Sequence, residues 1–192
     1  MLKKMALTVI VLIFSTDLLA QKLFSKKEFV LLQKLYGIAL DSFIGKKSAH
    51  FVLIDSSDNR AIQEIDFSSF AKDLDSSWVY LLRIADSIKP ALRRIKLEKI
   101  KTVHVVRYFN RDTIVKIQRA SHDVGRGIVS PYGWIDGIVT MSTPILSTKK
   151  DKAIIEISYT RDELDGNGGI LLLEKRKDGR WIVIKHLKTW VS

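Results

Sequence analysis

The sequence predicts an α+β protein in which an N-terminal helix packs on a largely antiparallel C-terminal sheet. Three observations support this fold class. Residues 25–45 carry apolar side chains at helical spacing, and residues 77–88 repeat that pattern. The last third of the chain instead contains four β-rich runs separated by turn residues. We therefore expect a helix and a strand, a second helix, and a mainly antiparallel sheet that ends in a hairpin.

The first helix begins at Ser25, which has capping-box spacing with Glu28, and ends at Gly45. The β-forming residues 49–55 predict a buried strand. Residues 56–76 are polar and only weakly patterned, so we expect mostly loop there.

Asp75 or Ser76 can cap the second helix, which should occupy residues 77–88. The β-branched run at residues 102–106 predicts a strand. The other elements expected before residue 135 are a short helix at 112–119 and a glycine-containing loop at 125–133.

The four C-terminal β-rich runs occupy residues 137–143, 152–160, 169–175 and 180–191. Asp178 and Gly179 lie between the last two runs. An Asp-Gly pair suits the positive φ angles that a tight hairpin turn requires, so the last two runs should form a hairpin.

Residues 1–20 have the features of a secretory signal peptide. Two lysines precede an apolar run at residues 6–14, and a short polar segment leads to Ala20. This run is too short to span a bilayer, which needs about 20 apolar residues, and no later segment comes closer. We expect cleavage after Ala20, one domain at residues 21–192, no transmembrane span in the mature chain, and export to the periplasm or the extracellular space.

The chain contains no cysteine, so neither disulfides nor thiol chemistry are available. It has 32 basic and 21 acidic residues; loss of residues 1–20 removes two lysines and one aspartate, which leaves a net charge of +10. Such a protein attracts anionic surfaces. Outside the cytoplasm these are acidic polysaccharide and anionic lipid, whereas nucleic acid is not an expected partner. The same charge also suits simple solubility.

The last third of the chain reads KAIIEISYT, DELDGNGG and ILLLEKRKDGRWIVIKHLKTWVS. This order of a β-run, a glycine-rich turn, a second β-run and a final Trp-hydrophobic-Ser resembles a group of uncharacterised exported bacterial proteins. The earlier segments YGIALDSFI and AHFVLID are similar to the first half of that group, whereas residues 107–132 depart from it. The resemblance implies secretion and an α+β fold, and it supplies no catalytic residues.

The stretch ELDGNGGILLLE, residues 163–174, has the spacing of a twelve-residue calcium loop. Such loops lie between helices, whereas the flanking segments here predict strands, and a strand would carry Glu174 away from an ion near Asp165. We therefore expect a glycine-rich turn with unusual backbone angles at Gly166, Gly168 and Gly169. The remaining calcium candidate is a non-helical turn formed by Asp162, Asp165 and Asn167.

Two basic stretches are the main candidates for a binding surface. Residues 89–107 hold seven basic residues against Glu98 alone, and the last hairpin adds six more, with Trp181 and Trp190 nearby. A basic face interleaved with aromatic side chains would suit acidic polysaccharide, lipid headgroups or single-stranded nucleic acid. The candidate anion-binding residues are Arg93, Arg94, Lys96, Lys99, Lys101, Lys175, Arg176, Lys177 and Arg180. The alternative is a solvated polar face.

Residue patterns for catalysis, metal or cofactor binding are sparse. The four histidines lack zinc-site spacing, and the consecutive Ser121, His122 and Asp123 cannot converge as a triad. Paired carboxylates for glycan hydrolysis could come from Glu64, Asp66, Asp73 and Asp75, although turns and helix caps explain these residues equally well. We therefore expect no cofactor and a non-catalytic envelope accessory or binding module with a basic face for anionic polymer.

Two alternatives to this function stay open. One is a hydrolase acting on envelope glycan or peptide. The other is a subunit of a larger envelope assembly, in which Trp190 and Val191 would form a contact at a sheet edge.

Overall fold

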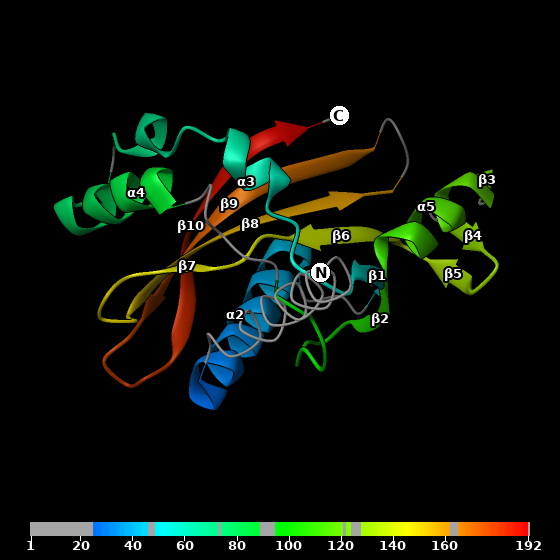
Figure 1. The fold of residues 1–192 in the computed structure, drawn as a ribbon, viewed down its shortest axis with the longest axis horizontal. Coiled ribbons are helices and arrows are strands. Elements are labelled where there is room, and N and C mark those ends of the chain that lie inside the picture. Colours follow the sequence, from blue (N-terminus) through cyan, green and yellow to red (C-terminus); the bar gives the residue numbers. More distant parts are fainter. Residues whose placement is uncertain are drawn as a thin grey trace, which may run out of the picture. The chain divides into compact units, whose positions relative to one another are not determined.

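The computed structural model describes residues 25–45, 49–72, 74–88, 95–120, 122–123, 128–161 and 165–191. The chain forms two compact units, Met1–Leu32 and Gln33–Ser192, and the second contains the sheets (Figure 1). The expected signal peptide lies outside the described residues. None of the helices within the ranges above has the length and the apolar character to cross a membrane.

A seven-stranded mixed sheet forms the centre of the second unit. Six strands follow the order β10-β9-β8-β6-β1-β2, and β7 pairs with β8. β1 is parallel to β2 and β6, whereas β6, β8, β9 and β10 are antiparallel to one another in turn. The strands are β1 (His50–Ile54), β2 (Val105–Phe109), β6 (Gly137–Met141), β7 (Ile145–Leu146), β8 (Lys152–Thr160), β9 (Gly166–Lys175) and β10 (Trp181–Val191). This arrangement confirms the α+β class and the mainly antiparallel C-terminal sheet.

One face of the sheet packs against short helices. Ile154, Ile170 and Leu172 belong to a buried cluster with apolar residues of α3, η1 and α4. Farther along the same face, the β1 and β6 side chains Val52 and Ile138 pack with α5. These elements are α3 (Arg60–Glu64), the 3-10 helix η1 (Phe67–Phe70), α4 (Ser76–Ile88) and α5 (Arg111–Ala120).

The opposite face carries the part of α2 (Lys26–Ile44) that belongs to the second unit. The Phe43 ring lies 5.1 Å from the His186 ring of β10. His186 pairs with Leu171, whose side chain points away from the Ile170 and Leu172 face because strand residues alternate. The sheet therefore lies between two helical layers.

The predicted helix ends are confirmed by their caps. Glu28 N donates to Ser25 Oγ (3.2 Å) and Ser25 N donates to Glu28 Oε2 (2.9 Å), which is the expected capping box. Gly45 follows α2 with a φ of +100°. At the start of α4, Asp75 Oδ1 accepts hydrogen bonds from the backbone N of Ser77 and of Trp78. These bonds are local, so their residues could be predicted.

The loop predicted at residues 56–76 was wrong in part, because α3 and η1 lie there. Ile62 and Phe67 are fully buried in the cluster under these elements. Tertiary packing of two isolated apolar side chains thus orders a segment with little helical pattern.

The strand predicted at residues 102–106 was displaced. β2 begins at Val105, where pairing with β1 starts. The preceding residues are held by α2 instead, since Asp41 Oδ1 accepts hydrogen bonds from Thr102 Oγ1 and Val103 N. Propensity located a strand here, and the contact with α2 decided its bounds.

The glycine-containing loop predicted at residues 125–133 was also wrong in part. A second, three-stranded sheet has the order β3-β4-β5. Gly133, with a φ of +93°, begins its last strand. The strands are β3 (His122–Asp123), β4 (Ile128–Ser130) and β5 (Gly133–Ile135), and residues 124–127 lie outside the described residues.

Candidate functional site

The β9–β10 hairpin presents the predicted basic residues at its turn. Arg176 N donates to the Arg180 carbonyl (2.8 Å), and Gly179 N donates to the Arg176 carbonyl (2.9 Å). Gly179 has a φ of +82°, whereas Asp178 does not have a positive φ. The hairpin prediction is confirmed, but the turn is a three-residue loop with a glycine bulge and not a turn with two positive φ angles. The loop consists of residues 177–179, and its first residue, Lys177, adds a cation to the turn.

Lys175, Arg176 and Lys177 form what we call the hairpin patch. All three side chains are exposed, and none forms an ion pair with another described residue. Arg180, the fourth predicted residue of this stretch, is paired with Asp178 (Nε to Oδ2, 2.7 Å). Hydrogen bonds from the backbone N and then the guanidinium of Arg180 lower the pKa of Asp178. The turn therefore retains a net positive charge.

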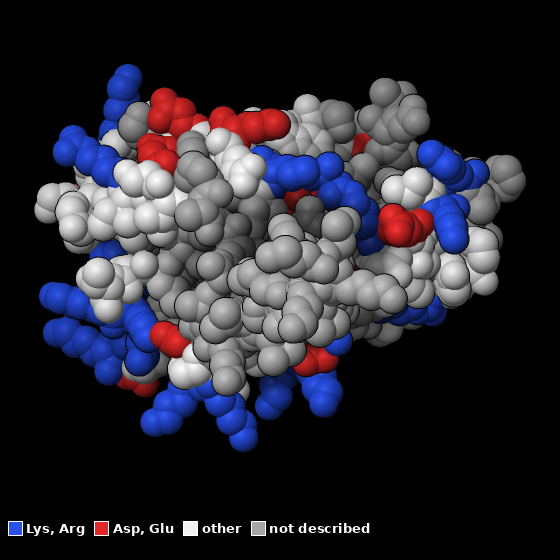
Figure 2. Space-filling model, in the orientation of Figure 1, with Lys and Arg blue, Asp and Glu red and all other residues white. Residues whose placement is uncertain are grey.

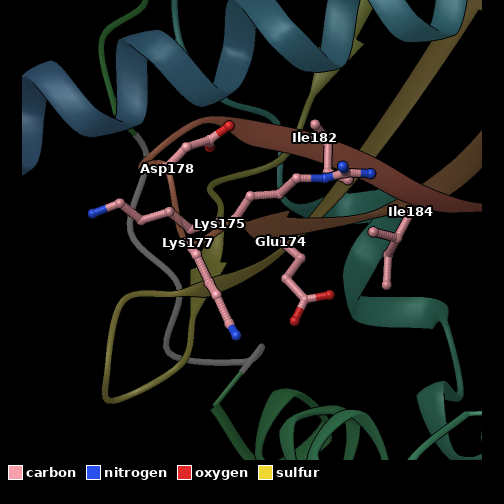
Figure 3. Close-up of a pocket in the computed structure, with 7 residues that line it drawn as sticks. Glu174, Lys175, Lys177, Asp178, Ile182 and Ile184 are labelled. Atoms are coloured by element: carbon pink, nitrogen blue, oxygen red, sulfur yellow. The ribbon is translucent and has the colours of Figure 1, made fainter.

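A shallow groove runs beside the hairpin patch. It has a volume of about 580 Å³. Figure 3 shows its side chains projecting from both strands and the turn, with Asp178 at the turn and Ile184 farther along β10. The lining residues are Glu174, Lys175, Arg176, Lys177, Asp178, Ile182 and Ile184. Cations thus line a groove whose floor is partly apolar, because Ile184 is 40% exposed.

The turn between β7 and β8, residues 147–151, adds lysines next to this hairpin. Lys175 N donates to the Asp151 carbonyl (2.7 Å), which joins the two turns. Lys149 and Lys150 are exposed. Figure 2 shows basic side chains gathered over these two turns, at the lower left of the view in Figure 1. The positive region therefore extends beyond a single hairpin.

The other predicted basic residues lie on a different element, residues 95–101, which we call the basic strap. Lys96, Lys99 and Lys101 belong to it, and it leads to β2, whereas β10 forms the opposite edge of the sheet. The structure therefore distributes the two basic stretches over different edges of the sheet. Arg93 and Arg94 lie outside the described residues.

The aromatic residues expected beside the cations have other positions. Trp181 is only 6% exposed. Trp190 lies at the far end of β10, nine residues along an extended strand and so roughly 30 Å away. The interleaving of aromatic and basic side chains expected from the sequence is therefore absent from the hairpin patch.

The glycine-rich stretch predicted as a turn belongs to β9. Gly166, Gly168 and Gly169 do not have positive φ, so the expectation of unusual backbone angles was wrong. A Cβ at Gly166 would lie 2.9 Å from Trp190 Cη2, and one at Gly168 would overlap the same indole. A Cβ at Gly169 would overlap the His186 ring. These glycines admit large side chains of β10 over the backbone of β9.

The calcium candidate has no assembled site in the described part of the chain. Asp165 pairs with Arg161 (2.7 Å), Asn167 pairs with Tyr159 across β9 and β8, and Asp162 lies outside the described residues. Within the described ranges, no group of three or more His, Cys, Asp or Glu residues could hold a metal ion. Binding at Asp162, Asp165 and Asn167 stays a prediction.

Two of the histidines contribute to packing. His104 is buried, with its ring 5.3 Å from that of Phe51 and its Nε2 3.8 Å from Asp41 Oδ1. His186 lies against Phe43, and burial followed by the charge of Lys188 lowers its pKa. Both side chains serve the interface between α2 and the sheet.

Sequence reasoning missed a buried carboxyl group, Glu156. Glu156 is 1% exposed, and neither of its carboxyl oxygens has a hydrogen-bond partner among the described residues. Burial, and then the negative charge of Asp58, raise the pKa of Glu156 to about 8. Asp58 is itself paired with Arg60 (2.9 Å) and Arg111 (3.4 Å). A glutamate within the apolar run KAIIEISYT was the signal available in the sequence.

This pair of carboxyl groups is not arranged as an open catalytic site. Asp58 is engaged by two guanidinium groups, and Glu156 is enclosed. Of the carboxylates proposed for glycan hydrolysis, Asp75 caps α4, and Asp73 lies outside the described residues. The hairpin patch, by contrast, is exposed and lines an open groove. No family model, curated protein or solved structure matches this chain.

Proposed function

We propose that the protein is an exported binding module that holds an anionic polymer, such as an acidic polysaccharide, through the hairpin patch. One observation carries this proposal: Lys175, Arg176 and Lys177 have no ion pair with another described residue and line an open groove. Export rests on the signal-peptide pattern of residues 1–20.

The charge balance of the turn supports this proposal. Its two carboxylates are already engaged, Glu174 by Lys152 (3.3 Å) and Asp178 by Arg180. Both carboxylates line the groove beside the hairpin patch, but each already has a basic partner outside that patch. Repeated anionic groups along a polymer can meet several cations at once, and each such contact is weakened by salt.

The test measures binding of the exported, processed protein to polygalacturonate at low and at moderate salt. We expect an affinity that falls about tenfold or more between about 50 and 300 mM NaCl, because the screening length shortens. The variant Lys175→Glu/Arg176→Glu/Lys177→Glu should lose this binding at low salt.

The basic strap supplies a matched control with the same number of charge reversals. Lys96→Glu/Lys99→Glu/Lys101→Glu changes the net charge equally on a different element. Equal loss of binding in both variants would show a response to net charge alone, and the proposal would then be wrong. Binding that persists at high salt would contradict it as well.

A further inference from the structure

A second cavity lies directly beside the hairpin patch, between α4 and the β7–β8 turn. Its volume is about 260 Å³. Its apolar lining consists of Leu81, Ile84 and Leu146, together with Tyr80, which is 65% exposed. This volume is slightly below the usual range for sites that enclose a drug-sized ligand, which begins at about 300 Å³. A narrow, flexible apolar group suits it better than a bulky one.

The rim of this cavity is polar and carries two lysines and one carboxylate. Ser77, Ser147, Thr148 and Lys149 contribute to it, as does Asp151, whose carboxylate accepts a hydrogen bond from Ser147 Oγ (2.7 Å). Lys152 completes it, with its Nζ 4.5 Å from the centre of the Trp78 ring. Hydroxyl groups and an exposed lysine thus surround an apolar floor, which is the arrangement that an amphiphile with an anionic head requires.

The cavity and the groove of the hairpin patch share a border. Lys152 lines the cavity and pairs with Glu174, which lines the groove (Figure 3), at 3.3 Å. The bond from Lys175 N to the Asp151 carbonyl joins the two sites a second time. A ligand in the cavity can therefore place a charged head beside the hairpin patch.

We propose that this cavity takes the acyl chain of an anionic lipid whose headgroup contacts Lys149 and the hairpin patch. The inference rests on the proposed function, since the same cations hold the anion. A sugar polymer has no long apolar group to pack against Leu81, Ile84 and Leu146. The acyl chain of a lipid is such a group.

Dodecyl phosphate, kept below its critical micelle concentration, is the probe, and calorimetry of the exported, processed protein gives its affinity. We expect dodecyl phosphate to bind about fifteenfold more tightly than decyl phosphate, since the two probes differ by two methylenes and each buried methylene contributes about fourfold. Inorganic phosphate lacks the alkyl chain, and dodecyl maltoside lacks the anionic headgroup. Both should therefore bind far more weakly than dodecyl phosphate.

Ile84→Phe fills the cavity, and Ile88→Phe is its matched control one helical turn farther along α4, where Ile88 is 38% exposed and outside the cavity lining. Ile84→Phe should weaken dodecyl phosphate binding about tenfold or more and leave polygalacturonate binding unchanged. Leu146→Phe fills the cavity from the other side and repeats the test if Ile84→Phe lowers the Tm.

The outcomes separate this inference from the proposed function. If Ile84→Phe and Leu146→Phe both leave the affinity for dodecyl phosphate unchanged, the alkyl chain binds outside this cavity and the inference is wrong. Equal affinities for dodecyl phosphate and inorganic phosphate would also overturn it. If polymer binding through the hairpin patch persists in that case, the proposed function stands by itself. A third outcome is that only the variant with three reversed charges loses binding of both dodecyl phosphate and polygalacturonate. That result would overturn the inference that the cavity holds the acyl chain, and it would support binding of anions by the hairpin patch.

Discussion

The hairpin patch and the basic strap look alike in sequence, yet they differ in what holds them. In the strap, Ile95, Leu97 and Ile100 are buried between the lysines. In the hairpin turn, no apolar residue lies between Lys175 and Arg180. The strap is therefore anchored to the core through its apolar side chains, whereas the hairpin turn buries no apolar side chain of its own.

Backbone hydrogen bonds widen this difference. The strap is bound to the segment after β1, since Leu97 N donates to the Asp55 carbonyl (2.7 Å) and Ser57 N to the Ile95 carbonyl (2.8 Å). It also packs so closely on α2 that a Cβ at Gly37 would overlap the Lys101 carbonyl. Charged residues at alternate positions are thus compatible with a structural role, and a run of lysines does not by itself indicate a ligand site.

Leu97→Ala should produce the largest difference between the two regions. Leu97 is buried in the strap, so its truncation should lower the free energy of unfolding by about 2–5 kcal/mol. Ile184→Ala, at an exposed position beside the hairpin patch, should cost far less. Urea unfolding measures both. Similar losses would mean that the strap is not anchored by its apolar side chains.

Glu156→Gln should change the pH dependence of stability, because Glu156 is buried whereas the side chains of the hairpin patch are exposed. The folded state binds the Glu156 proton more tightly, with a pKa of about 8 against 4.5 for the free side chain. Its stabilising contribution is complete below pH 4.5 and is lost as the pH rises to about 8, by about 1.4 kcal/mol per pH unit within that window.

Unfolding free energies at several pH values in this window should therefore fall less steeply in Glu156→Gln than in the natural protein. Charge reversal of the hairpin patch, whose side chains are exposed, serves as the comparison and should leave the slope unchanged. Parallel slopes for Glu156→Gln and the natural protein would refute the raised pKa.

Gly179→Ala should have the smallest effect. The positive φ of Gly179 costs a residue with a Cβ about 1–2 kcal/mol. A Cβ added at Gly179 would have no atom within 4 Å, so strain of the backbone is the whole penalty. Because the turn orients the hairpin patch, polygalacturonate affinity should fall only slightly. A loss as large as that of the variant with three reversed charges would mean that the turn geometry, and not charge, determines binding.

Several elements could be predicted from sequence because short-range physics specifies them. Ser25 and Glu28 cap one helix, Asp75 caps another, and the position of Gly179 identified the last hairpin. Local hydrogen bonds and backbone angles depend on neighbours within a few residues. Such features can therefore be predicted from short stretches of sequence.

Other features depended on residues far apart in the chain. Nothing local indicated that Gly166 and Gly168 admit the Trp190 indole, or that Asp41 holds residues before β2. The same limit applied to the candidate site. The cations at the turn were predicted, whereas their separation from Trp190 depended on strand pairing.

By itself, the sequence determined the fold class, the helix ends, the basic charge and the last hairpin, since composition, periodicity and capping are local properties. Only the tertiary structure decided which lysines stay unpaired, that Glu156 is enclosed, and that an apolar cavity adjoins the hairpin patch. Burial and ion pairing depend on which distant segments meet, and that is set by the packing of the sheet between its helices.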